Sequence, residues 1–262
     1  MNITKISILG VVFLSLCSLG AIDMQNLFIS SGVKFKTDNV NRGRREGRKT
    51  VIPHAELGCG ILDVGGIYVG AEAALAVEKE NSGNDIAPYV GLTFYPIDNF
   101  TVDCGYKHHM YPALSKSENF KRQSNEVYGG ISYDLSIIPS IYFYYDFDRK
   151  EFATEGKLAY TFDLSTQAIS GLAIDLEAKI GYDLSSKPYS MEYVEEMGSK
   201  GYLYYGATAD VVYSLNDSVS ARAGASFEGN AAKKDAWVQS AYDFKNAPKS
   251  KIWFSTSVDC KF

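Results

Sequence analysis

Polar and apolar side chains alternate along the last twelve residues of the chain, from Lys251 to Phe262. One face would carry Ile252, Phe254, Thr256, Val258, Cys260 and Phe262, and the other Lys251, Trp253, Ser255, Ser257, Asp259 and Lys261. Because successive side chains of a β-strand point to opposite sides, this pattern predicts a strand that separates an apolar from a polar medium.

The same two-sided alternation recurs and predicts about twelve strands of roughly 9–13 residues, the length that a tilted strand needs to cross a membrane. In the segment 171–183, for example, Leu172 begins the apolar face and Asp175 belongs to the charged face. The predicted strands are 26–37, 51–61, 66–78, 85–96, 99–110, 124–135, 139–148, 151–164, 171–183, 201–215, 217–229 and 251–262.

The connections between these strands alternate in length. Short turns are expected at 63–65, 96–99, 137–140, 165–170 and 215–217, and longer or more charged segments at 38–50, 79–84, 111–123, 184–200 and 230–250. Only 148–151 is short on the long side. Alternating short turns and long loops are typical of transmembrane barrels with an even strand number. The sequence therefore predicts an all-β fold, a closed antiparallel up-and-down barrel.

A soluble sandwich or lipocalin-like barrel is the alternative, and two sheets packed face to face would also alternate. The aromatic residues favour the membrane barrel. On the apolar faces, one group lies near the short turns: Phe94, Phe100, Tyr133, Phe162, Tyr213 and Phe262. A second group lies near the opposite ends: Phe35, Tyr145, Phe147, Phe152, Tyr182, Tyr205, Phe227 and Phe254. Two such belts match the aromatic girdles at the two membrane interfaces.

The beginning of the chain reads as a secretory signal peptide over residues 1–21, followed by one barrel domain over 22–262. Lys5 supplies the positive charge, residues 6–16 a short apolar core, and Ser18 to Ala21 a small-residue cleavage site. Cys17 raises a lipoprotein alternative, which the bulky Leu16 before it disfavours. Beyond the signal, no apolar run approaches the roughly 20 residues of a transmembrane helix. The formal charge of −5 argues against nucleic acid as a partner.

A closing strand that ends on an aromatic residue resembles the last strand and assembly signal of Gram-negative outer-membrane barrels. This resemblance implies that Phe262 is an assembly signal, that the barrel-assembly machinery is a partner, and that the chain lies in the outer membrane among lipid and lipopolysaccharide.

Several segments resemble the TorF-type porin family of outer-membrane barrels. They are Asn41-Arg42-Gly43, 53–60, Tyr89-Val90-Gly91, Val102-Asp103-Cys104-Gly105-Tyr106, Met110-Tyr111-Pro112 and Glu126-Val127-Tyr128-Gly129-Gly130. The family usually has an aromatic residue before its Arg-Gly, where this chain has Asn41. The resemblance implies a barrel, a signal peptide and a porin, and it carries over no catalytic or binding residue.

The charged face of the strands would line the interior of the barrel. The predicted pore-lining residues are Lys34, Glu56, Glu72, Asp103, Lys107, Glu126, Asp146, Glu155, Lys157, Asp175, Glu177, Lys179, Asp210, Arg222 and Asp259. Because acids outnumber bases, a hydrated lumen would weakly favour cations. The alternative is that these charges pair across the interior and plug it.

The segment 38–50 is basic, with Arg42, Arg44, Arg45, Arg48 and Lys49. At the outer surface its guanidinium groups would match the phosphates of lipopolysaccharide. Folded inward, it would place a cationic constriction against the acidic wall. A solvated loop is the third possibility.

An outer-membrane lipid hydrolase would need a histidine and a serine on the lipid face near the outer rim. His108 is the one histidine with that placement, and no serine stands in a glycine elbow motif. We therefore expect no enzyme, metal or cofactor. The sequence predicts an outer-membrane channel for passive diffusion of small hydrophilic solutes, with a non-conducting structural or interaction barrel as the alternative.

Overall fold

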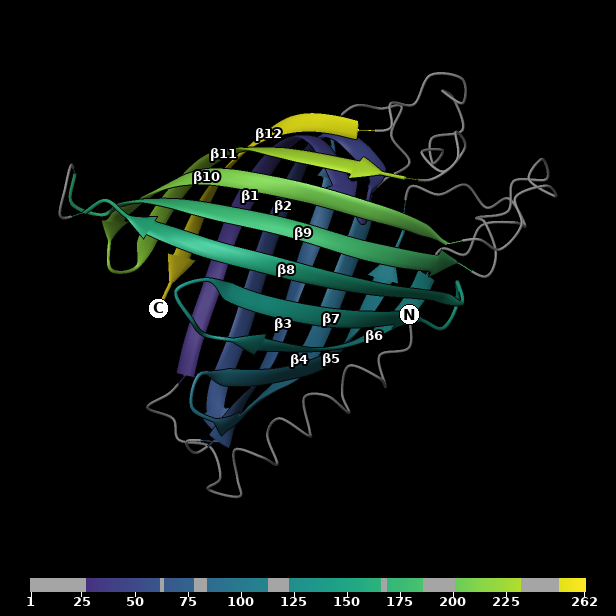
Figure 1. Ribbon diagram of the computed structural model, residues 1–262, viewed down its shortest axis with the longest axis horizontal. Coiled ribbons are helices and arrows are strands. Elements are labelled where there is room, and N and C mark those ends of the chain that lie inside the picture. The colour runs from purple at the N-terminus through teal and green to yellow at the C-terminus, as the bar shows by residue number, and fades with distance from the viewer. Residues whose placement is uncertain are drawn as a thin grey trace.

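The computed structural model describes residues 27–61, 64–77, 84–112, 123–165, 169–185, 201–231 and 250–262, which form twelve strands closed into a barrel (Figure 1). The strands are β1 (Leu27–Asn41), β2 (Arg44–Ile61), β3 (Gly65–Ala76), β4 (Asp85–Ile97), β5 (Phe100–Met110), β6 (Gln123–Tyr133), β7 (Ile138–Asp146), β8 (Glu151–Asp163), β9 (Leu172–Ser185), β10 (Tyr202–Asn216), β11 (Val219–Asn230) and β12 (Ser250–Lys261). The predicted signal peptide lies outside the described residues.

Each strand pairs antiparallel with its neighbours in the sequence, and β1 pairs with β12 to close the ring. That closing register runs from Ser30 opposite Lys261 to Lys36 opposite Ser255. The backbones of Ile29 and Phe262 extend it with two reciprocal hydrogen bonds of 2.9 and 2.8 Å. The predicted closed antiparallel up-and-down barrel is therefore confirmed.

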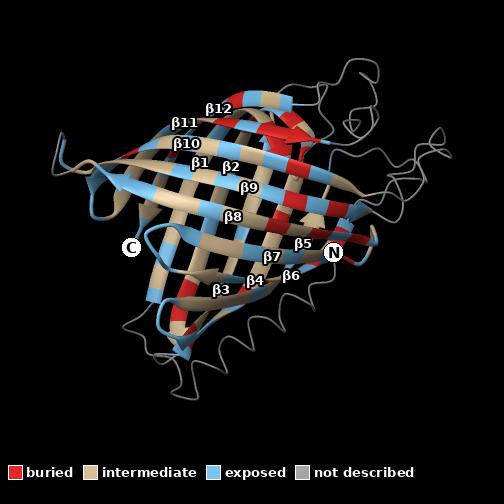
Figure 2. Ribbon diagram, in the orientation of Figure 1, coloured by how far each residue is buried: buried red, intermediate tan, exposed pale blue. Residues whose placement is uncertain are grey.

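The barrel is apolar outside and polar inside, which reverses the arrangement of a water-soluble core. Large apolar side chains such as Ile252 and Phe254 are 65% and 61% exposed. Among the described residues, thirteen buried ones are polar or charged and eight are hydrophobic. Figure 2 shows the buried positions mostly toward the end that carries the long connections. Water would penalise so large an apolar surface, whereas hydrocarbon would not.

The aromatic belts predicted from the sequence lie on this outer face. Phe94, Phe162 and Phe262 are exposed near the short turns, and Phe147 and Phe254 are exposed toward the opposite ends. In the part of the chain that the structure describes, no helix is both long and apolar enough to span a bilayer. With one closed sheet in place of two packed sheets, the sandwich alternative is wrong.

The predicted loop 38–50 is wrong in extent, because β1 and β2 continue to a turn of two residues, Arg42 and Gly43. Both have positive φ, 48° and 71°, as a type I′ hairpin turn requires. Because charged residues are so frequent in this segment, polar and apolar residues do not alternate there, and the pattern does not predict a strand. The other strand ends agree with the sequence-based ranges to within two residues.

Lysine substitutions at two adjacent positions of β10 test which face meets lipid. Val211 is half exposed on the outer face, whereas Asp210 borders the interior. We expect Val211→Lys to lower the free energy of unfolding by about 2–4 kcal/mol, since a lysine near the bilayer midplane has that cost. Asp210→Lys should cost much less because the lumen can hydrate the ammonium group. Denaturant unfolding in lipid vesicles measures both, and equal losses would contradict this orientation.

Candidate functional site: a lumen crossed by the β1–β2 hairpin

The tip of the β1–β2 hairpin leaves the barrel wall. Pairing of β1 with β12 ends at Lys36, and pairing of β2 with β3 begins at Thr50. Between these points, residues 38–48 pair with each other across the hairpin, with a register shift at Asn39 and Val40. Such a bulge bends a strand and increases its twist. We call residues 38–48 the inward hairpin.

Arg42, at the tip of the inward hairpin, reaches the opposite wall of the barrel. Its guanidinium lies 2.8 Å from the Glu126 carboxylate on β6, and 4.1 Å above the centre of the Tyr144 ring on β7. Burial by itself would lower the pKa of Arg42, but Glu126 and Glu151 outweigh it and raise the pKa above its ordinary value. The tip therefore carries a permanent positive charge.

The backbone of the tip is held by β10 and β11. The Tyr202 hydroxyl donates a hydrogen bond to the Arg42 carbonyl at 2.9 Å, and the Asn230 amide donates to the Gly43 carbonyl at 3.0 Å. A Cβ at Gly43 would lie 2.8 Å from the Cβ of Tyr204, so this close approach requires glycine. Contacts with four strands far from β1 and β2 show that the inward hairpin crosses the lumen. Of the three alternatives for 38–50, the structure has the inward constriction.

Two cavities occupy the interior. The larger, of about 1000 Å³, is bordered by the inward hairpin and mainly by inner side chains of β1 to β9. The smaller, of about 700 Å³, is bordered mainly by β1, β2 and β10 to β12. Lys36, Ile52 and Glu72 border both. Between the described residues, the lumen thus retains open space with a polar lining.

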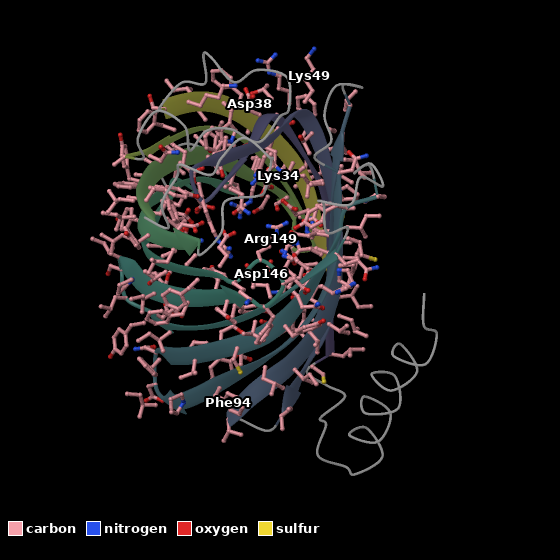
Figure 3. The ribbon with its side chains drawn as sticks, turned by 90° about the vertical axis from the view of Figure 1, so that its right-hand side faces the viewer. Lys34, Asp38, Lys49, Phe94, Asp146 and Arg149 are labelled. Carbon is pink, nitrogen blue, oxygen red and sulfur yellow. The ribbon has the colours of Figure 1, made fainter. Side chains whose placement is uncertain are left out.

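Twelve of the fifteen predicted pore-lining residues border these cavities. Eight border the larger one: Glu56, Glu72, Asp103, Lys107, Glu126, Glu155, Lys157 and Lys179. Four more border the smaller one: Lys34, Asp210, Arg222 and Asp259. Of the remaining three, Asp175 pairs with Arg222, Asp146 is buried beside Arg149, and Glu177 lies on the same strand face as Asp175. Figure 3 looks into the barrel and shows Asp146 and Arg149 within the ring, while Phe94 lies on its rim.

Many of these charges pair with one another. The ion pairs are Lys107 with Glu72, Lys157 with Glu155 (3.1 Å), Lys179 with Glu155 (3.9 Å) and Glu228, and Arg222 with Asp175 (2.6 Å) and Asp259 (3.9 Å). The larger cavity is bordered by seven carboxylates and six lysines or arginines, and the smaller by four of each. The acidic excess expected from the strand faces is therefore nearly cancelled, because Arg42, Arg149, Lys36 and Lys261 add to the bases.

Two carboxylates of the larger cavity are held by tyrosines. Asp103 accepts hydrogen bonds from the hydroxyls of Tyr68 (2.6 Å) and Tyr142 (3.2 Å), and Glu56 accepts one from Tyr89 (3.0 Å). A neutral phenol leaves the charge of its acceptor in place, unlike a lysine. Their negative charges therefore contribute to the potential of the larger cavity.

Sequence reasoning missed two parts of this lumen. Arg149, in the β7–β8 turn, hydrogen-bonds Tyr111 and lies 3.5 Å from Asp146. Because Arg149 lies in a connection and not in a strand, the alternation pattern did not predict that its side chain points inward. The inner tyrosines share the strand face of the charged residues, so their phase in the alternation was an available signal.

His108 lies on the outer face of β5, where its Nδ1 is 2.8 Å from the Asn125 Oδ1. The Asn125 amide donates to Asp148 at 2.6 Å. The flanking residues on the same strand face are Tyr106, whose hydroxyl also donates to the Asn125 Oδ1, and Met110, so no serine or threonine stands beside His108 on that face of β5. The network orients the imidazole but does not support the hydrolase alternative. Within the described ranges, no cluster of three or more His, Cys, Asp or Glu could hold a metal.

Comparison with known proteins supports the fold. No family model matches the chain, so the TorF-type resemblance is not confirmed, and no curated protein matches it either. Among solved structures, the NanC porin aligns with 90% of this chain and all of its own at 11% identity and a TM-score of 0.50. The KdgM porin (8% identity, 89% and 99% covered, TM-score 0.49) and an outer-membrane channel from Pseudomonas putida F1 (8%, 92% and 98%, 0.49) are also similar. At 11% identity, the likeness to the NanC porin shows the barrel fold alone.

Replacing Arg42 by Asn tests what fixes the inward hairpin. Asn-Gly is a favoured dipeptide for a type I′ turn, so Arg42→Asn keeps the turn and removes only the contacts with Glu126 and Tyr144. We expect amide hydrogen exchange in residues 38–48 to accelerate by about tenfold or more, since a partly buried ion pair is lost. Asp163→Asn, at an exposed position at the end of β8, is the control. Equal exchange in the two variants would show that Arg42 does not hold the tip.

Proposed function

We propose that this chain is an outer-membrane porin, exported by its signal peptide, through which small hydrophilic solutes diffuse passively. The open, polar lumen carries this proposal. Side chains of both signs border cavities of about 1000 and 700 Å³, and a solute passing them would avoid contact with hydrocarbon. The segments that resemble the TorF-type family agree with this proposal, and the outer end of the barrel would lie against lipopolysaccharide.

The inward hairpin sets the width of the proposed path. The tip of the hairpin is held from two directions. The Arg42 side chain pairs with Glu126 on β6, and the Gly43 carbonyl accepts a hydrogen bond from Asn230 on β11. Because these anchors are hydrogen bonds and one ion pair, the tip narrows the lumen without sealing it by an apolar plug. The channel is therefore a constricted one, with a weak preference for cations set by Glu56 and Asp103.

Single-channel recording tests the channel and its constriction together. In planar bilayers we expect the mature wild-type chain to give small, uniform current steps, and Arg42→Asn to give larger ones because the tip is released. Asp163→Asn should behave as wild type. If correctly folded barrels give no steps at all, the protein is a non-conducting structural or interaction barrel. Folding is verified by the usual difference in gel mobility between boiled and unboiled samples.

Ion selectivity tests the electrostatic part separately. Under a salt gradient, the wild-type reversal potential should indicate weak cation preference. The double variant Glu56→Gln, Asp103→Asn should move it toward zero or to the anion side, since the two carboxylates held by tyrosines are neutralised. Asp163→Asn, an exposed position at the end of β8, serves as the control. A clear anion preference of the wild type would refute this assignment.

A further inference from the structure

Four tyrosines form a continuous surface on one wall of the larger cavity. Each lies directly opposite a glycine on the adjacent strand and covers it: Tyr68 covers Gly91, Tyr89 covers Gly70, Tyr128 covers Gly105 and Tyr142 covers Gly130. A side chain at any of these glycines would collide with its tyrosine. The side chains therefore lie down against the wall instead of projecting into the lumen. We call these four tyrosines the tyrosine floor.

The tyrosine floor is held in place by its own hydroxyl groups. Tyr68 and Tyr128 hydrogen-bond each other at 2.7 Å, and Tyr68 and Tyr142 both donate to Asp103 on β5, which lies between them in the sheet. Tyr89 donates to Glu56. All four rings are half-buried and border the larger cavity. Because this aromatic surface is already rigid, its side chains lose little conformational entropy when a solute binds.

The groups around the tyrosine floor are hydrogen-bonding groups of both kinds. A carboxylate has about four acceptor positions, and the tyrosines occupy two on Asp103 and one on Glu56. Lys107 and Lys157 border the same cavity and supply donors. Seven carboxylates against six cationic side chains leave the cavity close to neutral, so a strongly charged solute of either sign gains little from it.

A solute that suits this wall has an apolar ring face for the tyrosines and several hydroxyl groups for the carboxylates and lysines. We propose that the tyrosine floor is a binding track for neutral carbohydrates that pass through the larger cavity. This proposal rests on the channel function proposed above and names the class of solute. Binding would be weak, because a track must release the solute as readily as it accepts it.

The barrel offers a matched control on its outer face. Tyr205 on β10 covers Gly229 on β11 in the same cross-strand arrangement, but its side chain is exposed on the apolar side. A tyrosine that covers a glycine on the next strand therefore indicates packing within the barrel wall, and it does not by itself indicate a binding site. The tyrosine floor differs because its rings are clustered, face the cavity and adjoin carboxylates.

Block of the ion current by sugars tests the proposal. With maltose as the probe in planar bilayers, we expect millimolar concentrations to interrupt the wild-type current. Tyr89→Ala and Tyr142→Ala should raise the half-blocking concentration about fivefold or more, whereas Tyr142→Phe, which keeps the ring, should change it less. Tyr205→Ala should leave it unchanged. Each variant must first show the gel-mobility shift of a folded barrel.

Three outcomes would overturn the proposal: wild-type current that maltose does not interrupt, stronger block by choline or glucuronate than by maltose, or equal effects of Tyr142→Ala and Tyr205→Ala. Calorimetric titration of the detergent-solubilised barrel with maltose separates this result from the channel function. Tyr142-dependent maltose binding without any conductance would refute the channel and retain the sugar track. Conductance without maltose binding would refute the sugar track and retain the channel.

Discussion

The hydrogen bonds that join β1 to β12 are the constraint on which the rest of the structure depends. In hydrocarbon, every unpaired backbone N–H or C=O costs several kcal/mol, so a sheet can span a membrane only if it has no free edge. The seven paired residues from Ser30 to Lys36, together with the reciprocal bonds of Ile29 and Phe262, remove that edge. Once the ring is closed, the alternation of each strand sends one set of side chains to the lipid and the other to the lumen.

Closure also decides how the interior must be stabilised. Because the apolar side chains face outward, there is no hydrophobic core to fill the ring, and polar groups have to satisfy each other. Ion pairs such as Arg222 with Asp175 do this along the wall. The inward hairpin does it across the lumen, where Arg42 neutralises Glu126 and the tip accepts hydrogen bonds from Tyr202 and Asn230. The same contacts that stabilise the interior therefore define its width.

The strand number, the closed topology and the lipid-facing side of each strand could be predicted from the sequence, because a period of two residues is a local property. The strand Lys251–Phe262 shows this most plainly. The sequence could offer the inward hairpin only as one of three alternatives, since Arg42 meets Glu126 and Tyr144 only after the ring has closed. The same holds for the charge balance of the cavities. Tyr68 covers Gly91 only because the register of β3 and β4 places the two residues opposite each other. The sequence of a single strand does not reveal that register.

The inward hairpin and the tyrosine floor meet at one place in the lumen. Arg42 lies over the ring of Tyr144, and Tyr144 is stacked beside Tyr142 with their ring centres 6.1 Å apart. The guanidinium thus covers the aromatic ring next to the floor and leaves Tyr142 bordering the cavity. In the proposed channel, a solute that passed the tip would next meet the wall that carries Asp103. Two strands carry residues of both features: β6 has Glu126 and Tyr128, and β7 has Tyr144 and Tyr142, so the proposed constriction and the proposed binding surface share one part of the wall.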